Sequence, residues 1–367
     1  MNTPARLLLI LITLFVVSLS VAQNALAPKT IERLETEISS EMSKLGIPGI
    51  SIAVVVNHKL VWAGGYGFSD LENFVPAKST TAYRLASISK PLTAVAVLQL
   101  AEQKKIDLDA PIQTYCPSFP TKRWPVTARQ LLAHLGGVRH YRNDEIMLTK
   151  QFNSIGDGLT IFTADSLDHE PGTKYLYSTY GYNLLGCVIE GASGMTYVEY
   201  MKKSVFTPAA MDRIQVDEIS AIIPNRAQGY RMGPNGELLN SALANTSYKI
   251  PGGGYISTVN DLAKFAVALQ TGVLLKPETV QMMFTPQKTR DGKPASDTPA
   301  AAYALGWRIS EYKQEREVAH SGSQQRVRTY LYMRPDRKFA LVLMCNLEGV
   351  NLTPIARSLS DIVFEKP

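Results

Sequence analysis

The stretch RLASISKPL, residues 84–92, decides how this sequence is interpreted, because it places Ser87 three residues before Lys90. Proline is tolerated in the first turn of a helix, so Pro91 is consistent with a helix that begins near Ser87. Residues three apart share one face of a helix, which puts the lysine amine beside the serine hydroxyl. The stretch alone leaves a second interpretation open, in which Ser87 is only an N-cap residue.

A second serine and lysine with the same spacing lie in ISEYK, at Ser310 and Lys313. This pair falls at the end of a predicted strand, among charged residues, and no helix follows it. We interpret it as a chance occurrence of a common spacing.

Composition predicts a globular protein with a substantial core. The chain has 367 residues, of which 45% are hydrophobic and 19% charged, and its formal net charge is +6. The basic residues are scattered, and their densest clusters are pairs such as Lys202 and Lys203. A nucleic-acid-binding protein would gather them into a stripe or patch, so we predict no nucleic-acid partner.

The N-terminus predicts a secretory signal peptide over residues 1–22. Arg6 precedes the apolar run LLLILITLFVVSLSVA, and Ser20 and Ala22 form a small-x-small cleavage site. The run is shorter than the roughly 20 residues that a membrane-spanning helix needs. We therefore expect cleavage after Ala22 and export to the periplasm or the extracellular space, with no stable membrane span. The alternative is an uncleaved segment that anchors the protein.

The cysteines and histidines do not suggest a metal or a cofactor. An odd count of three cysteines, Cys116, Cys187 and Cys345, argues against a disulfide framework. We expect all three to be small buried apolar residues. No cysteine or histidine has the spacing of a metal site, so no metal and no cofactor are predicted. We expect His134 and His140 to be structural.

The order of predicted elements indicates an α/β (α+β) fold. Apolar periodicity predicts a helix over 28–45 and a hairpin over 50–56 and 59–65, and strands return near the C-terminus before a last helix over 352–364. The predicted central helices are 92–103, 127–137, 182–194, 196–203 and 258–272, and the later strands are 305–310, 317–322, 327–333 and 339–346. PGGGY, residues 251–255, is expected to be a tight turn, and 286–301 an exposed loop.

This order predicts an antiparallel sheet flanked by the terminal helices, with a mainly helical domain inserted between its halves. One domain is expected over residues 28–367. Within it, 28–86 and about 250–367 form the α/β part, and 87–250 the mainly helical part.

Two further motifs accompany the serine and the lysine. PGTKYLYST, residues 171–179, presents Tyr177 ahead of a buried helix, and AHSGSQ, residues 319–324, presents His320 at a strand end. With S-x-x-K, these motifs in this order resemble those of the serine beta-lactamase and penicillin-binding-protein superfamily, from about residue 30 to the C-terminus. GIPGISIAVVV, RLASISK, LLAHLGGVRHY and YSTYGYNLLG are most similar to the mitochondrial serine beta-lactamase-like proteins called LACTB and their bacterial relatives.

The resemblance implies an active site. Ser87 would be the nucleophile, with Lys90 and Tyr177 as its catalytic partners. The backbone N–H groups of Ser87 and Ser323 would form the oxyanion hole, and the remaining substrate-binding positions would be Thr179, His320, Ser321 and Gly322. A serine hydroxyl needs an adjacent base.

Two assignments of that base remain open. Lys90 can act as the base if its pKa falls by about three units from the ordinary value near 10.4. Alternatively, a charged Lys90 stabilises a Tyr177 phenolate that takes the proton. The two groups titrate as a unit in either case.

Two departures from the family motifs bear on the substrate. Thr179 replaces an asparagine that contacts the substrate's amide side chain, and His320 replaces a lysine that binds a β-lactam's carboxylate. Histidine, with an ordinary pKa near 6.5, is mostly neutral at pH 7. These departures favour a peptidase or esterase over an efficient β-lactamase.

The sequence therefore predicts an exported serine hydrolase that cleaves a peptide, amide or ester bond through a Ser87 acyl-enzyme. Its substrate would be a small peptide, an ester or a β-lactam-like compound. One alternative is a true β-lactamase or DD-carboxypeptidase. Another is a penicillin-recognising sensor that never releases its adduct, or a self-assembling scaffold, because LACTB-like proteins include filament formers. No segment identifies an oligomer interface.

Overall fold

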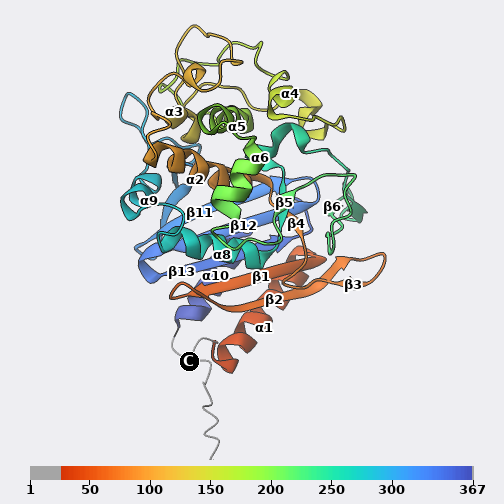
Figure 1. The fold of residues 1–367 in the computed structure, drawn as a ribbon. Coiled ribbons are helices and arrows are strands. Elements are labelled where there is room, and N and C mark those ends of the chain that lie inside the picture. The colour runs from red at the N-terminus through yellow and green to blue at the C-terminus, as the bar shows by residue number, and fades with distance from the viewer. Residues whose placement is uncertain (1–25, 366–367) are drawn as a thin grey trace, which may run out of the picture.

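An eight-stranded sheet with the strand order β3-β2-β1-β13-β12-β11-β10-β9 organises the molecule (Figure 1). The structure is a computed structural model and describes residues 26–365, so the predicted signal peptide lies outside the described residues. The sheet strands are β1 Gly49–Val56, β2 Lys59–Asp70, β3 Val75–Pro76, β9 Ala302–Tyr303, β10 Arg308–Tyr312, β11 Glu315–Gln324, β12 Val327–Arg334 and β13 Phe339–Cys345. Every pairing in this sheet is antiparallel, which confirms the predicted fold class.

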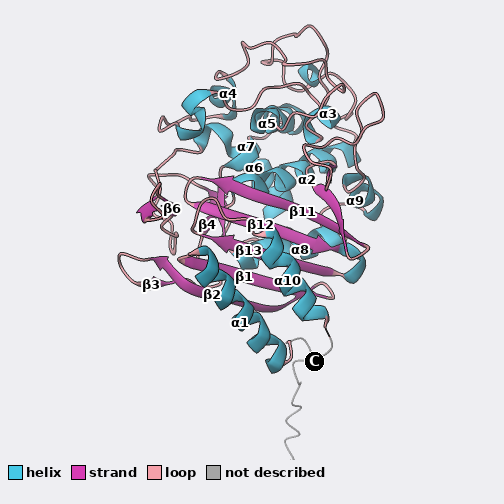
Figure 2. Ribbon diagram, turned by 180° about the vertical axis from the view of Figure 1, so that it is seen from behind, coloured by secondary structure: helices cyan, strands magenta, loops and turns pink. Residues whose placement is uncertain are grey.

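The two terminal helices cover one face of the sheet. α1 (Pro28–Leu45) and α10 (Thr353–Phe364) lie side by side across it in Figure 2. Their apolar side chains, among them Leu34, Ile38 and Leu359, form one core with residues of β1 and β13. The sheet's central strands are buried on both faces, which explains why β13 has the unbroken apolar sequence FALVLMC.

The helical part covers the opposite face. α8 (Val259–Gln270) packs directly on β1 and β13, and α2 (Ser89–Glu102) packs against α5 (Thr179–Ser193). α2 is apolar on all sides because protein surrounds it on all sides. The remaining elements are α3 Ala128–Leu132, α4 Ile155–Leu159, α6 Tyr197–Tyr200, α7 Ile250–Gly253, α9 Pro277–Met283, β4 Tyr83–Arg84, β5 Gln215–Val216, β6 Tyr230–Met232, β7 Leu238–Asn240 and β8 Tyr255–Ser257.

Two predicted elements differ from the structure. The helix predicted over 127–137 has the expected capping box of Thr127 and Gln130 but ends at Leu132, because His134 adopts a left-handed backbone with φ 59°. PGGGY is not a tight turn: its first residues lie in the short helix α7, and Tyr255 begins β8. Within residues 26–365, no helix is long and apolar enough to cross a membrane.

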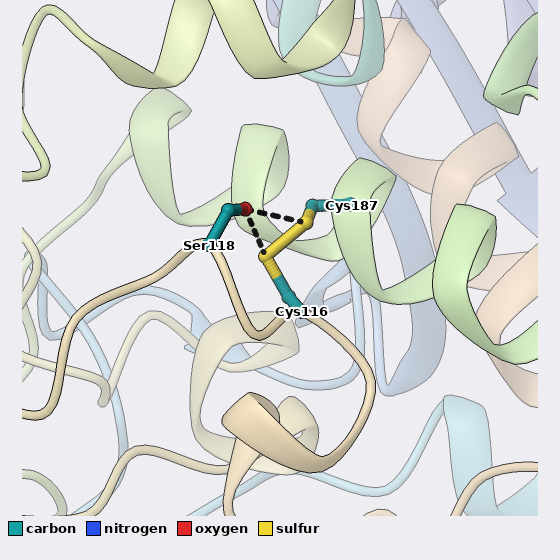
Figure 3. The surroundings of a disulfide bond; sticks show 3 residues. All are labelled: Cys116, Ser118 and Cys187. Atoms are coloured by element: carbon teal, nitrogen blue, oxygen red, sulfur yellow. Dashed lines mark hydrogen bonds between the residues drawn. A yellow bond between two sulfur atoms is a disulfide. The ribbon is translucent and has the colours of Figure 1, made fainter.

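The prediction that all three cysteines are unpaired is wrong for two of them. Cys116 and Cys187 form a disulfide with a Cα–Cα distance of 5.4 Å, and the Ser118 hydroxyl lies beside both sulfur atoms (Figure 3). The loop can approach α5 this closely because Gly191, one turn after Cys187, has no side chain. A Cβ there would lie 1.7 Å from the carbonyl oxygen of Tyr115. Cys345 is free and buried, as predicted.

Reduction of this disulfide is expected to destabilise the protein. The bond closes a loop across a sequence separation of 71, and such cross-links typically contribute about 2–4 kcal/mol. Urea unfolding of the oxidised protein, the reduced protein and a C116S/C187S double variant should show a similar loss for the last two. Cys345→Ala is the control variant that keeps the cross-link. Equal stability of the oxidised and reduced proteins would contradict the assignment.

Candidate active site

Ser87 lies in a short 3₁₀ turn, Ala86–Ile88, immediately before α2. It is the only residue between Thr81 and Leu98 that is not buried. Two hydrogen bonds fix the residue that precedes this turn. The Leu85 N–H donates to the carbonyl oxygen of Tyr255, and the Leu85 carbonyl oxygen accepts from the Thr329 hydroxyl on β12. Ala86 has a φ of 48°, a left-handed conformation that is strained for a residue with a side chain. A strained, firmly held turn thus presents the serine hydroxyl to the surface.

The Lys90 amine is fully buried and contacts Ser87. Its Nζ lies 3.0 Å from Ser87 Oγ, 3.1 Å from Thr179 Oγ1 and 2.8 Å from the carbonyl oxygen of Gly252. A neutral amine has two N–H donors and one lone pair. Thr179 Oγ1 and the Gly252 carbonyl oxygen can each accept a hydrogen bond from one N–H, while the lone pair faces the Ser87 hydroxyl.

The surroundings of Lys90 favour that neutral form. Burial, followed by the positive charges of Lys249 and Arg308, holds the pKa of the Lys90 amine well below its usual range. Burial also raises the pKa of the Tyr177 phenol to about 12, although a hydrogen bond with Ser87 opposes the shift. Burial thus favours the protonated phenol of Tyr177 and the neutral amine of Lys90. The centre of the Tyr177 ring lies 4.8 Å from Lys90 Nζ.

Thr179 lies at the first position of α5, where its hydroxyl contacts Lys90. The side chain is 2% exposed, and it also shares a hydrogen bond with Tyr141. Gly252 packs against it so closely that a Cβ would lie 2.5 Å from the Thr179 methyl group. Thr179 thus lines the cavity, while its hydroxyl is engaged by neighbouring protein groups.

The C-terminal half of β11 forms the opposite wall of the site. β10 pairs with β11 only as far as Ala319, so the backbone of residues 320–324 has one open edge. Ser321 and Ser323 are exposed on this segment and line the cavity. Gly322 is buried behind it, where a Cβ would lie 2.4 Å from the carbonyl oxygen of Leu85. Glycine at this position lets the strand approach the turn that carries Ser87.

His320 is a neutral, buried histidine. Nδ1 lies 2.8 Å from the carbonyl oxygen of Ser321, which can only accept, so this nitrogen carries the proton. Nε2 lies 2.9 Å from the Tyr303 hydroxyl and accepts from it. Burial, followed by the charges of Lys90 and Arg308, holds the histidine's pKa well below its usual range. His320 therefore supplies no fixed positive charge to the site.

These residues surround a cavity of about 300 Å³. Ser87, Tyr177, Thr179, His320, Ser321 and Ser323 line it. The cavity is also lined by His140 and Gly252, for which no functional role was predicted, and by Tyr141, Lys249 and Arg308, which the sequence did not single out. These five residues come from three segments far apart in the chain, around 140, 250 and 308, so no sequence pattern connects them.

His134 and His140 both support the start of α5. His134 Nδ1 accepts a hydrogen bond from the Ser178 N–H at 3.1 Å, and the His134 ring packs on Tyr177. His140 Nδ1 accepts from the Thr179 N–H at 3.3 Å. His134 is structural, as expected. His140 also lines the cavity, so the prediction of a purely structural role is incomplete.

Arg308 adds a positive charge that is already paired. Its guanidinium binds both carboxylate oxygens of Asp297, at 2.7 and 3.0 Å, and lies 5.9 Å from the centre of the Tyr177 ring. No group of three or more metal-ligating side chains occurs in the part of the chain that the structure describes. The chemistry available here is that of a serine hydroxyl, an amine and a phenol.

Comparison with known proteins places the chain in one family. The beta-lactamase family model matches residues 33–360. The human mitochondrial serine beta-lactamase-like protein LACTB is 31% identical, over 88% of this chain and 77% of that protein.

Solved structures share the fold. The octameric penicillin-binding protein homologue from Pyrococcus abyssi superposes with a TM-score of 0.77 and 26% identity, covering 92% of this chain and 78% of that one. D-amino acid amidase from Ochrobactrum anthropi, complexed with L-phenylalanine amide, has a TM-score of 0.78 at 22% identity, covering 91% and 97%. The chain belongs to the beta-lactamase family of serine hydrolases.

Proposed function

We propose that this protein is an exported hydrolase that cleaves a peptide, amide or ester bond through an acyl-enzyme on Ser87. The observation that carries the proposal is the 3.0 Å contact between Ser87 Oγ and a buried Lys90 amine whose pKa is held low. A hydroxyl beside a neutral amine is an activated nucleophile.

The reaction begins with proton transfer from Ser87 to Lys90. Ser87 Oγ forms a bond to the substrate's carbonyl carbon, and the carbonyl oxygen gains negative charge. The backbone N–H groups of Ser87 and Ser323 are our candidates for binding that oxygen. Tyr177, protonated and hydrogen-bonded to Ser87, donates its proton to the leaving amine or alcohol, and Lys90 replaces it. Water then attacks the acyl-enzyme and releases the acid.

A neutral His320 and a fully engaged Thr179 favour peptide, amide or ester substrates over β-lactams. The ammonium that would bind a β-lactam carboxylate in the family is absent at position 320, and Arg308 already binds Asp297. The open edge of β11 offers backbone groups to an extended acyl chain.

Two features support export. The N-terminal sequence has the composition of a signal peptide. The Cys116–Cys187 disulfide is of a kind that persists in oxidising compartments.

A fluorophosphonate reagent is expected to label Ser87, because the serine lines the cavity and has a base beside it. Mass spectrometry of the labelled protein should place the adduct on Ser87. Ser87→Ala should abolish labelling, and Lys90→Ala should slow it by about 100-fold or more, which is the usual contribution of a general base. Ser310→Ala, in the second S-x-x-K, is the matched control. Undiminished labelling of Lys90→Ala would contradict the assigned base.

The labelling rate is expected to rise with pH as Lys90 loses its proton, since only the neutral amine accepts the proton of Ser87. The midpoint should lie well below 10.5, the value for an ordinary lysine, because burial disfavours the charged form. The same profile should show no inflection from His320, whose pKa is held low. A midpoint at 10.5 would mean that Lys90 is not perturbed.

Neutralising the carboxylate of a cephalosporin by esterification is expected to have little effect on the rate of its hydrolysis. We would compare a chromogenic cephalosporin with its methyl ester. The rates should differ by less than about fivefold, because an already paired cation contributes little. Efficient turnover that esterification abolishes would support the β-lactamase or DD-carboxypeptidase alternative. A stable adduct without turnover would support a sensor.

A further inference from the structure

Lys249 is a second buried lysine in the candidate active site, and the mechanism gives it no contact with the substrate, although its charge lowers the pKa of Lys90. It ends the 3₁₀ turn Ser247–Lys249 that precedes α7, and it is 1% exposed. Its Nζ lies 5.1 and 5.3 Å from the ring centres of Tyr141 and Tyr248, and the side chain lines the cavity. Among residues 26–365, this amine forms no hydrogen bond and no ion pair within 4.0 Å, and the charges that act on its pKa are those of Arg84 and, in the opposite direction, Asp217. An unpaired buried ammonium is costly, so a missing partner is informative.

The other buried cations near the site do have partners. Arg308 binds Asp297 through two hydrogen bonds. Arg84 lies 2.7 Å from Asp217, which also lies 3.7 Å from Arg226. Lys249 is thus the cation of the cavity wall that remains available to a bound anion.

The position of Lys249 indicates which part of a substrate it faces. Tyr177, the proton donor to the leaving group, lies near His320 and Arg308, with ring centres of Tyr177 and His320 6.4 Å apart. Lys249 lies instead beside Tyr141, whose hydroxyl contacts Thr179. This arrangement favours a leaving group on the side of the cavity near Tyr177 and an acyl group on the side near Lys249.

We propose that Lys249 binds a carboxylate carried by the acyl portion of the substrate, which makes it a specificity-determining residue for acidic acyl groups. This inference rests on the hydrolase function proposed above. The unpartnered amine in the cavity wall supplies the cation, and the two tyrosine rings hold it in place. A carboxylate there would give Lys249 the charge-assisted hydrogen bond that it lacks.

The binding should depend on pH. The charged and titratable groups that face Lys249 are Arg84, Lys90, His140, Tyr141, Asp217 and Tyr248. Burial, followed by the charge of Arg84, lowers the pKa of Lys249 to about 7, with Asp217 opposing the shift. The free site is therefore cationic below about pH 7 and neutral above it, so the preference for an acidic acyl group declines as the pH rises.

The test uses two fluorophosphonates with the same short alkyl chain, one ending in a carboxylate and the other in a carboxamide. In each reaction Ser87 Oγ bonds to phosphorus, the proton passes to Lys90, and fluoride leaves with the electrons of the P–F bond. The measured quantity is the ratio of the two second-order labelling rates, because the carboxamide reagent corrects each variant for the state of its nucleophile.

Lys249→Met is expected to lower this ratio about 10- to 100-fold at pH 6, the equivalent of one charge-assisted hydrogen bond. Lys249→Arg should keep the preference and extend it above pH 7, because guanidinium stays charged. Lys203→Met removes an exposed lysine and is the control for net charge. An unchanged ratio in Lys249→Met, or equal slowing with both reagents, overturns the inference. If neither reagent labels wild-type Ser87, the proposed function fails and the inference fails with it.

Discussion

The contact between the Lys90 amine and the Ser87 hydroxyl is the interaction on which the rest of the structure depends. It requires a lysine side chain with no exposure to water, and most of the surrounding architecture excludes water from it. α2, which carries Lys90, is apolar on all sides, and α5 packs against it. α7 brings the Gly252 carbonyl oxygen to within hydrogen-bond distance of the Lys90 amine. Gly252 and Gly322 each permit a close approach that a side chain would block, to Thr179 and to the turn that carries Ser87.

The carboxylates around the site are paired with arginines, and within residues 26–365 no carboxylate forms an ion pair with Lys90. Asp297 and Asp217 pair with arginines, while the histidine at position 320 stays neutral between a tyrosine hydroxyl and a carbonyl oxygen. The net effect is a positive potential at Lys90 that is not cancelled by a nearby carboxylate. That potential disfavours the ammonium form and stabilises negative charge on a substrate oxygen.

The sequence predicted the parts of this structure that depend on short-range patterns. The terminal helices, the hairpin and the C-terminal strands follow from apolar periodicity. The three motifs identified part of the cavity lining, namely Ser87, Tyr177, Thr179, His320, Ser321 and Ser323. Lys249 and Arg308 could not be predicted, because segments far apart in the chain bring them to the wall and neither belongs to a motif. The disulfide was missed because the odd count of cysteines was taken as evidence against a disulfide framework, although an odd count also allows one pair and one free cysteine. The end of α3 depends on the left-handed backbone of His134, which amphipathic periodicity does not reveal.

The buried lysines also connect the chemistry of the site to the stability of the fold. A lysine whose pKa is lower in the folded than in the unfolded state binds fewer protons when folded, so the free energy of unfolding rises with pH. For Lys249 the interval lies between about 7 and its ordinary 10.5, and for Lys90 it ends at the same upper value. Acidification therefore lowers the free energy of unfolding. Protonation of Lys90 contributes to this loss, and it also removes the base that activates Ser87. In the unfolded chain, with Lys90 in water, Ser87 has no base and is an ordinary serine. Its reactivity is thus a property of the completed fold alone.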